Sequence, residues 1–198
     1  MKQELFEPGN YYHIFNRGNN KENLFKEKEN YIYFLQLMEK YLPEICNIYS
    51  YCLLPNHFHI LLKIKEVSEL PVSYQKAEKR IHQPFSNMFN AYTKAINKRY
   101  NRTGSLFQEH LHRIKVDTEE YFKNLVLYIH LNPEKHKIID CFSSYDYSSY
   151  KAYLNKNESL LNKSEVVDYF DDISNFIICH QDRKIRLELI NEVEKLDY

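Results

Sequence analysis

Glycine is scarce in this chain and tryptophan is absent: the 198 residues include only three Gly and no Trp. Neither G-x-x-x-x-G-K-[S/T] nor G-x-G-x-x-G occurs, and these glycine-rich loops hold the phosphates of common nucleotide cofactors. Two of the four cysteines, Cys46 and Cys52, lie six residues apart in a strand-like run, too far for a disulfide bond. We therefore expect no nucleotide cofactor of these kinds, reduced cysteines and a cytoplasmic protein.

Long apolar segments are also lacking. No stretch reaches the roughly 18 uninterrupted apolar residues that a membrane-spanning helix needs, and residues 1–9 are polar and acidic, without the apolar region of a signal peptide. Hydrophobic residues nevertheless make up 43% of the chain, which is enough for a folded core. We expect a globular protein that does not bind a membrane.

Neither sign of charge is in excess overall, because 27 Lys and Arg balance 27 Asp and Glu. The charges are unevenly spread. Residues 164–198 contain nine acids and four bases, whereas residues 94–115 contain six bases and a single acid, Glu109. Aromatic residues are interspersed in this basic segment, a combination compatible with a nucleic-acid surface. A solvated helix surface explains the same composition.

Hydrophobic periodicity predicts alternating strands and helices. The expected strands are residues 11–17, 45–53, 57–65 and 111–116, and the expected helices are residues 28–41, 85–100 and 119–132. Pro133 is expected to end the last helix, because a proline disfavours helical geometry in the residue before it. This order indicates an α+β sandwich, with a mainly antiparallel sheet and helices on one face. Residues 1–153 are expected to form the main domain, and residues 154–198 an acidic extension of short helices.

Two histidines stand out in the strand predicted over residues 57–65. His57 and His59 project from the same face of a strand, with Cα atoms about 7 Å apart, so both imidazoles can reach one metal ion. Two ligands leave a metal site incomplete, and a third must come from elsewhere in the chain. The alternative is two unrelated histidines on a half-buried sheet.

The last predicted helix carries a second polar pair. Tyr128 and Asn132 are four residues apart, so they lie on one face at the carboxyl end of that helix. A phenol beside a carboxamide is a candidate nucleophile next to a candidate ligand. Taken alone, the pair is also explained by a surface tyrosine and a helix-capping asparagine.

Several motifs together resemble one known family. They are Tyr-His-Ile-Phe-Asn-Arg-Gly at residues 12–18, Pro-Asn-His-Phe-His at 55–59, Gly-Ser-Leu-Phe-Gln-Glu at 104–109, Leu-Tyr-Ile-His-Leu-Asn-Pro at 127–133 and Tyr-Ser-Ser-Tyr at 147–150. In this order, over roughly residues 10 to 153, the chain resembles the single-tyrosine HUH transposases, in particular the REP-associated tyrosine transposases. The resemblance implies a ferredoxin-like HUH sandwich.

The resemblance also implies a site and a reaction. His57 and His59 are expected to bind a divalent metal, Mg²⁺ or Mn²⁺, with Asn132 completing the site. Tyr128 is expected to attack a phosphodiester of single-stranded DNA and to form a 5′-phosphotyrosine, so that strands are cut and rejoined near hairpins without a nucleotide cofactor. The expected partner is single-stranded or hairpin DNA, and the protein is expected to be a monomer or a homodimer.

Phosphate contacts are expected from basic side chains in and near the basic segment. The candidates are Arg17, Lys94, Arg99, Arg102 and Arg113. Lysine and arginine neutralise backbone phosphates and supply most of the sequence-independent affinity for nucleic acids.

Three other functions remain open on the sequence. A domesticated protein that binds DNA hairpins without cutting keeps the same fold. A replication initiator or relaxase of the HUH type commonly uses paired tyrosines or a third histidine, but His130 lies about 200° around the helix from Tyr128. In a plain interaction module, the histidine pair is structural.

Overall fold

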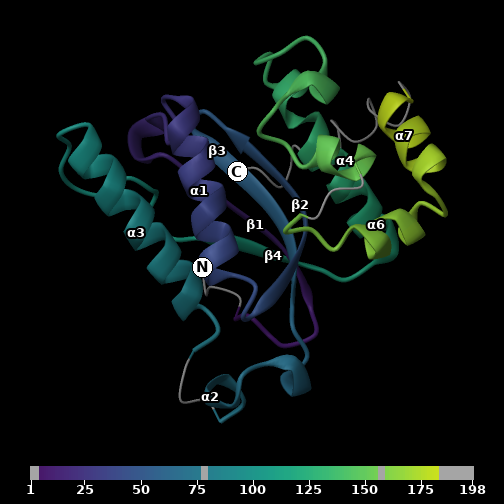
Figure 1. Cartoon of the computed structure of the whole chain (residues 1–198), viewed down its shortest axis with the longest axis horizontal. Helices are drawn as coiled ribbons and strands as arrows, with labels where there is room; N and C mark the ends of the chain where they lie inside the picture. Colours follow the sequence, from purple (N-terminus) through teal and green to yellow (C-terminus); the bar gives the residue numbers. More distant parts are fainter. Residues whose placement is uncertain (1–4, 77–79, 156–158, 183–198) are drawn as a thin grey trace.

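A four-stranded antiparallel sheet forms the centre of the protein, in the order β2–β3–β1–β4 (Figure 1). The computed structural model describes residues 5–76, 80–155 and 159–182. The strands are β1 (Tyr11–Arg17), β2 (Cys46–Leu54), β3 (His57–Ile64) and β4 (His112–Val116). Each lies within one residue of its predicted bounds, and the predicted α+β class with a mainly antiparallel sheet is confirmed.

Helices and short turns connect and cover the strands. The helices are α1 (Lys28–Tyr41), α2 (Val72–Gln75), α3 (Gln83–Arg99), α4 (Glu119–Lys135), α5 (Tyr150–Leu154), α6 (Lys163–Tyr169) and α7 (Ile173–Gln181), and the 3₁₀ turns are Asn19–Lys21, Val67–Glu69 and Phe142–Ser144. Over the described part of the chain, none of the helices has the length and apolar character needed to cross a membrane.

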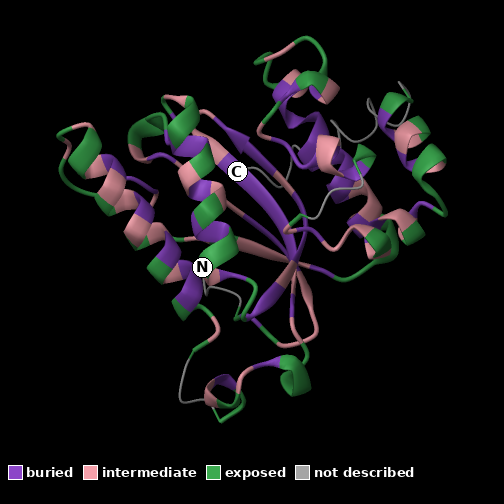
Figure 2. Cartoon of the chain, in the orientation of Figure 1, coloured by how far each residue is buried: buried purple, intermediate pink, exposed green. Residues whose placement is uncertain are grey.

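Helices pack on both faces of the sheet, so the expectation of helices on one face is wrong. Phe34 of α1 packs on Phe58 of β3 with ring centroids 5.3 Å apart, whereas Tyr128 of α4 packs on His59, the next residue of β3, at 5.6 Å. Successive residues of a strand face opposite sides, so α1 and α4 cover different faces (Figure 1). The reason is composition: almost every residue of β3 is buried, and both faces need cover (Figure 2).

Helix α4 continues beyond its predicted end. It runs to Lys135 with Pro133 inside it, so the expected end at Asn132 is wrong. Proline removes one N–H donor, here the donor to the carbonyl one turn earlier. The following turn still closes, because the His136 N–H donates to the Asn132 carbonyl at 2.9 Å and the Ile138 N–H donates to the Pro133 carbonyl at 2.9 Å. The face of α4 that carries Tyr128 and Asn132 is therefore longer than the sequence indicated.

A buried chain of hydrogen bonds ties α7 to the outer side of α4. The His180 ring donates from Nδ1 to the Phe176 carbonyl at 2.7 Å, so its Nε2 accepts from Nδ1 of His130 at 2.8 Å. Nε2 of His130 then accepts from the Ser149 hydroxyl at 2.7 Å, and that oxygen accepts the Tyr51 N–H at 2.9 Å. Each hydrogen bond in this series determines which atom donates in the next, and the series requires both imidazoles to be neutral.

Acid should weaken this attachment through His180. Burial lowers the pKa of His180 to about 4, against 6.5 in an exposed ring. The stability that this group contributes is present above pH 6.5 and is lost as the pH falls from 6.5 toward 4. In His180→Gln, the amide oxygen keeps an acceptor for His130 but does not titrate. Between pH 7.5 and 5.0, urea unfolding should show the wild type losing about 2 kcal/mol more than His180→Gln. Equal losses in the two proteins would contradict the assignment.

Candidate active site

Polar residues on β3 and α4 face each other across the buried interface between them. The His59 ring lies 5.6 Å from the Tyr128 ring, and the His57 ring lies 4.8 Å from the ring of His136, the residue that follows α4. Tyr128, Asn132 and His136 are spaced by one helical turn each and lie along one face. Asn132 therefore lies on the helix between the residues that make these two contacts.

Two polar atoms in this interface, one nitrogen and one oxygen, have no hydrogen-bond partner. His59 Nε2 and Asn132 Oδ1 are both buried without one, although the Asn132 amide donates from Nδ2 to the Tyr128 carbonyl at 2.9 Å. Leaving a buried polar atom unsatisfied costs about 1–3 kcal/mol. Nδ1 of His57 is already bonded to Oδ1 of Asn56 at 2.7 Å, which leaves the ring's Nε2 for a ligand. These donors fit a cation held by two imidazoles and one carboxamide.

An amide oxygen is the candidate third ligand of such a site. Within residues 5–76, 80–155 and 159–182, no group of three or more His, Cys, Asp or Glu side chains is arranged to hold a metal ion. Asn132 is of a type outside that set, and its unpaired side-chain oxygen is suited to complete a site with the two imidazoles. Oxygen ligands suit Mg²⁺ and Mn²⁺, and imidazole suits several transition metals.

The site keeps its histidines neutral. Burial, helped by the nearby His136, Arg17 and Lys135, lowers the pKa of His57 to about 3. Burial also holds the pKa of His59 well below its usual range. A neutral imidazole is the form that binds a metal, so both rings are ready as ligands at neutral pH.

Two cations border the site. Arg17 pairs with His57 in the β1–β3 register, so the two side chains lie on the same face of the sheet. The Lys135 ammonium lies 4.7 Å from the centroid of the Tyr128 ring. With neutral imidazoles and these two positive groups, the site is suited to an anion such as a phosphate.

The site is more open at one end. Tyr128 and His59 are each 2% exposed and Asn132 is fully buried, whereas His57 and Arg17 are half-buried and His136 is exposed. A ligand therefore meets His57 and Arg17 first, at the end of the sheet where β1 ends and β3 begins.

The five predicted phosphate contacts are spread over several parts of the fold. Only Arg17 borders the site. Arg113 pairs with Ile14 in the β1–β4 register and lies over the Phe6 ring at 4.4 Å, on the opposite face of the sheet. Lys94 is exposed on α3.

The remaining two arginines form ion pairs beside α3. Arg99 pairs with Glu27, and Arg102 pairs with Glu22 at 2.7 Å. These pairs join the start of α1 and the turn before it to the end of α3. The contacts give both arginines a structural role, whatever they contribute to ligand binding.

Three residues at the site were missed on the sequence: His13, Lys135 and His136. His13 is fully buried on β1 and lies beside His59, but the sequence does not reveal which strands pair. Lys135 is seven residues after Tyr128, a helical spacing that was available, but the helix was expected to end before it. His130, as predicted, is directed away from the site, toward His180.

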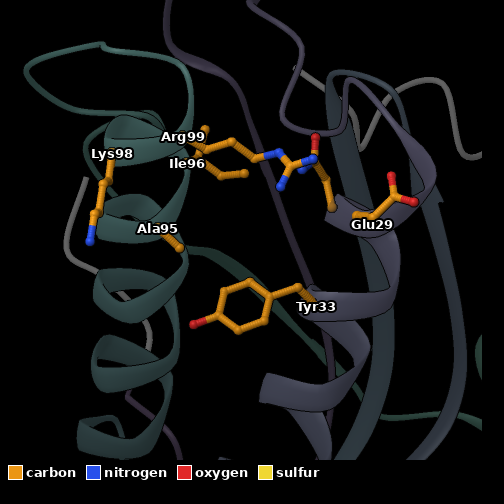
Figure 3. A pocket seen from close by; sticks show the side chains of 7 residues that line it. Glu29, Tyr33, Ala95, Ile96, Lys98 and Arg99 are labelled. Carbon is orange, nitrogen blue, oxygen red and sulfur yellow. The ribbon is translucent and has the colours of Figure 1, made fainter.

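A separate cavity of about 570 Å³ lies between α1 and α3, on the other face of the sheet. In Figure 3, Tyr33 extends from α1 toward α3, while Lys98 points away from α1. The lining residues are Glu29, Asn30, Tyr33, Ala95, Ile96, Lys98 and Arg99. None of them belongs to the site around Tyr128.

Comparison with known proteins gives a family match and a structural match. The family model described as "Transposase IS200 like" matches residues 8–132, which include β1, β3 and α4 up to Asn132. A solved structure, described as the REP-associated tyrosine transposase bound to a REP hairpin, is similar in fold, with a TM-score of 0.58 and 14% identity. The similarity covers 79% of this chain and 85% of that one. No curated protein matches.

Replacing Asn132 tests whether its unpaired side-chain oxygen is a metal ligand. In Asn132→Leu, the apolar side chain removes the unsatisfied atom at similar volume, so stability without metal should stay within about 1 kcal/mol of the wild type. Affinity for Mn²⁺, measured by calorimetry, should fall at least about tenfold. Asn30→Leu is the control, because Asn30 is also buried but its side chain accepts the Glu27 N–H at the start of α1. That variant should lose stability and keep its Mn²⁺ affinity, and the reverse pattern would exclude Asn132 as a ligand.

Proposed function

The chain belongs to the family of IS200-like transposases, and on that premise we propose that it cuts and rejoins single-stranded DNA through a covalent bond to Tyr128. The observation that carries this proposal is the pair of buried, unpartnered donors, His59 Nε2 and Asn132 Oδ1, in the same interface as the Tyr128 ring. Stability alone does not account for such atoms.

The proposed reaction exchanges one phosphoester for another. The Tyr128 hydroxyl oxygen attacks the scissile phosphorus, and the bond from phosphorus to the 3′ oxygen breaks. The phenol loses its proton and the leaving 3′ oxygen gains one, so the protons balance. The products are a 5′-phosphotyrosine and a free 3′-hydroxyl. The number of phosphoester bonds is conserved, so the strand can be rejoined without ATP. A free phenol has a pKa near 10 and is a weak nucleophile, so the reaction requires activation.

A divalent cation, Mg²⁺ or Mn²⁺, is proposed to be held by His57, His59 and Asn132. When bound, it supplies Lewis-acid polarisation of the scissile phosphate. The side chains do the rest of the preparation. Burial keeps both imidazoles neutral, and packing against α4 fixes the direction of the His59 ring. Water is largely excluded around Tyr128, which strengthens electrostatic interactions with the reacting phosphate.

Arg17 and Lys135 are proposed to bind the scissile phosphate. Arg17 stands beside His57 at the open end of the site, and Lys135 lies over the Tyr128 ring. An arginine can bind a phosphate through two parallel hydrogen bonds, whereas a lysine acts as a flexible point charge. Lys135 is thus the group that can follow the charge on the reacting oxygens, and Arg17 is the one that orients the phosphate.

Hairpin DNA is the proposed substrate, by analogy with the solved structure, which is bound to a REP hairpin. The segment between α3 and β4 is proposed to contact the DNA, because it lies against the open end of the site. The Gln108 N–H donates to the Arg17 carbonyl at 3.0 Å, and the Asn19 N–H donates to the Leu106 carbonyl at 2.9 Å. These two backbone bonds hold residues 106–108 beside Arg17, so a DNA strand that reaches Arg17 also passes this segment.

We also propose that residues 1–153 form the catalytic domain and that residues 159–182 of the acidic extension support it, the other residues after 155 lying outside the described part. The family match ends at Asn132, so it leaves the extension outside. The bond between His180 and His130 supports a bracing role, since it joins α7 to the helix that carries Tyr128.

The main test is covalent capture of DNA. With a labelled single-stranded hairpin substrate and Mn²⁺, the wild type should form an adduct that survives a denaturing gel. Tyr128→Phe should reduce the adduct to below detection while leaving the thermal unfolding midpoint nearly unchanged. Tyr121→Phe is the control, because it removes a phenol seven residues earlier on the same helix and should leave the adduct intact. Tight hairpin binding without any adduct would favour the domesticated, non-cleaving binder.

A second test separates phosphate orientation from general attraction of DNA. Arg17→Gln should lower the single-turnover cleavage rate about a hundredfold, because it removes one preorganised donor to the reacting phosphate. Lys63→Gln is the control: it lies on the same strand as His57, about 20 Å farther along, where it pairs with Glu66. That variant should cut within about threefold of the wild type. Equal losses in the two variants would exclude an orienting role for Arg17.

A further inference from the structure

A third histidine lies next to the proposed metal ligands. His13 of β1 is completely buried, and its Nε2 is 3.0 Å from Nδ1 of His59. The two rings are nearly parallel, at an interplanar angle of 23°, with centroids 5.2 Å apart. Phe15 and Tyr128 flank the His13 ring at 4.8 and 6.4 Å. Aromatic packing therefore holds His13 in a fixed orientation beside His59.

The hydrogen bond between the two rings allows two arrangements of protons. In the first, His59 donates from Nδ1 and its Nε2 carries a lone pair. In the second, His13 donates from Nε2, and the neutral His59 ring then carries its proton on Nε2. Only the first arrangement leaves His59 able to bind a cation through Nε2. The choice between them is made by whatever contacts His59 Nε2, since that atom has no partner in the protein.

We propose that His13 is a positioning residue for the metal site: it accepts the Nδ1 proton of His59 and so presents the Nε2 lone pair to the cation. This inference rests on the proposed function, because it concerns the same cation. Metal-binding histidines almost always donate their second ring N–H to a carboxylate, a carbonyl or a water, which fixes the ring and raises its basicity. His13 takes that place here.

A purely structural role accounts poorly for His13. Its Nδ1 is buried without a hydrogen-bond partner, which costs free energy that a leucine at the same position avoids. The ring lies among aromatic side chains, where an apolar residue would pack well. What a leucine cannot provide is an acceptor for His59.

The neutral acceptor also has a consequence for the substrate. A carboxylate in this position adds a negative charge next to the cation, whereas an imidazole adds none. The positive charge of the site is then kept for the phosphate. The structure thus assigns His13 two linked effects: it fixes the His59 tautomer and it preserves the attraction for an anion.

The test compares two substitutions with different chemistry. His13→Leu removes the acceptor, and His13→Gln keeps a neutral oxygen acceptor near the position of Nε2. Mn²⁺ affinity by calorimetry should fall 10- to 100-fold in His13→Leu and should stay within about threefold of the wild type in His13→Gln. Equal losses in both variants, or no loss in His13→Leu, would overturn the inference.

A spectroscopic measurement on the wild type makes the test independent of how the variants fold. ¹⁵N–¹H spectra of the histidine rings with saturating Mg²⁺ should show His59 protonated at Nδ1 only. A proton on Nε2 under these conditions would overturn the role of His13. A wild type that binds no Mn²⁺ at a site sensitive to His57→Ala would instead overturn the proposed function itself, so the two failures can be told apart.

Discussion

The contact between α4 and β3 is the constraint on which the site depends. A helix and a strand that are both largely apolar press together, and the few polar groups caught between them have no water to bond with. Most buried polar atoms in proteins find a partner, so His59 Nε2 and Asn132 Oδ1 are exceptions that require a reason. A cation and a phosphate are the partners that these atoms, with Arg17 and Lys135 beside them, are suited to accept.

Helix α4 is held from two sides, and this fixes the positions of the polar side chains that it carries. Toward the sheet, its side chains pack on β2 and β3. On the outer side, His130 is fixed by His180 and Ser149 in a chain in which each hydrogen bond determines the next. The extension is also bonded directly to the sheet, because the Tyr49 hydroxyl of β2 donates to Glu165 of α6 at 2.7 Å. Catalytic side chains need positions defined to a fraction of an ångström, and such support provides them.

The sequence predicted most of the sheet, and it predicted which side chains the four proposed site residues lie beside, because both depend on local patterns. Alternation located β3 and put His57 and His59 on one face, and helical spacing put Tyr128 next to Asn132. The layers could not be predicted in the same way, since a buried strand is apolar on both faces and does not say which helix covers which. His13 depends on the pairing of β1 with β3, a long-range contact that one sequence does not record. Lys135 was missed for a local reason: Pro133 normally ends a helix, and here the next turn tolerates it.

The charges of the site lead to one more step. The groups that act on the pKa of His57 and His59, besides burial, are other histidines, Arg17 and Lys135. Neutral ligands do not reduce the charge of a cation, so a loaded site carries the charge of the metal together with that of two basic side chains. Such an excess of positive charge in a buried place is unfavourable until an anion arrives. Metal and DNA phosphate should therefore each raise the affinity for the other, and by linkage the two effects are equal. A carboxylate in place of His13 or Asn132 would neutralise part of the metal's charge and weaken this coupling, which gives a physical reason why the proposed site contains imidazoles and an amide.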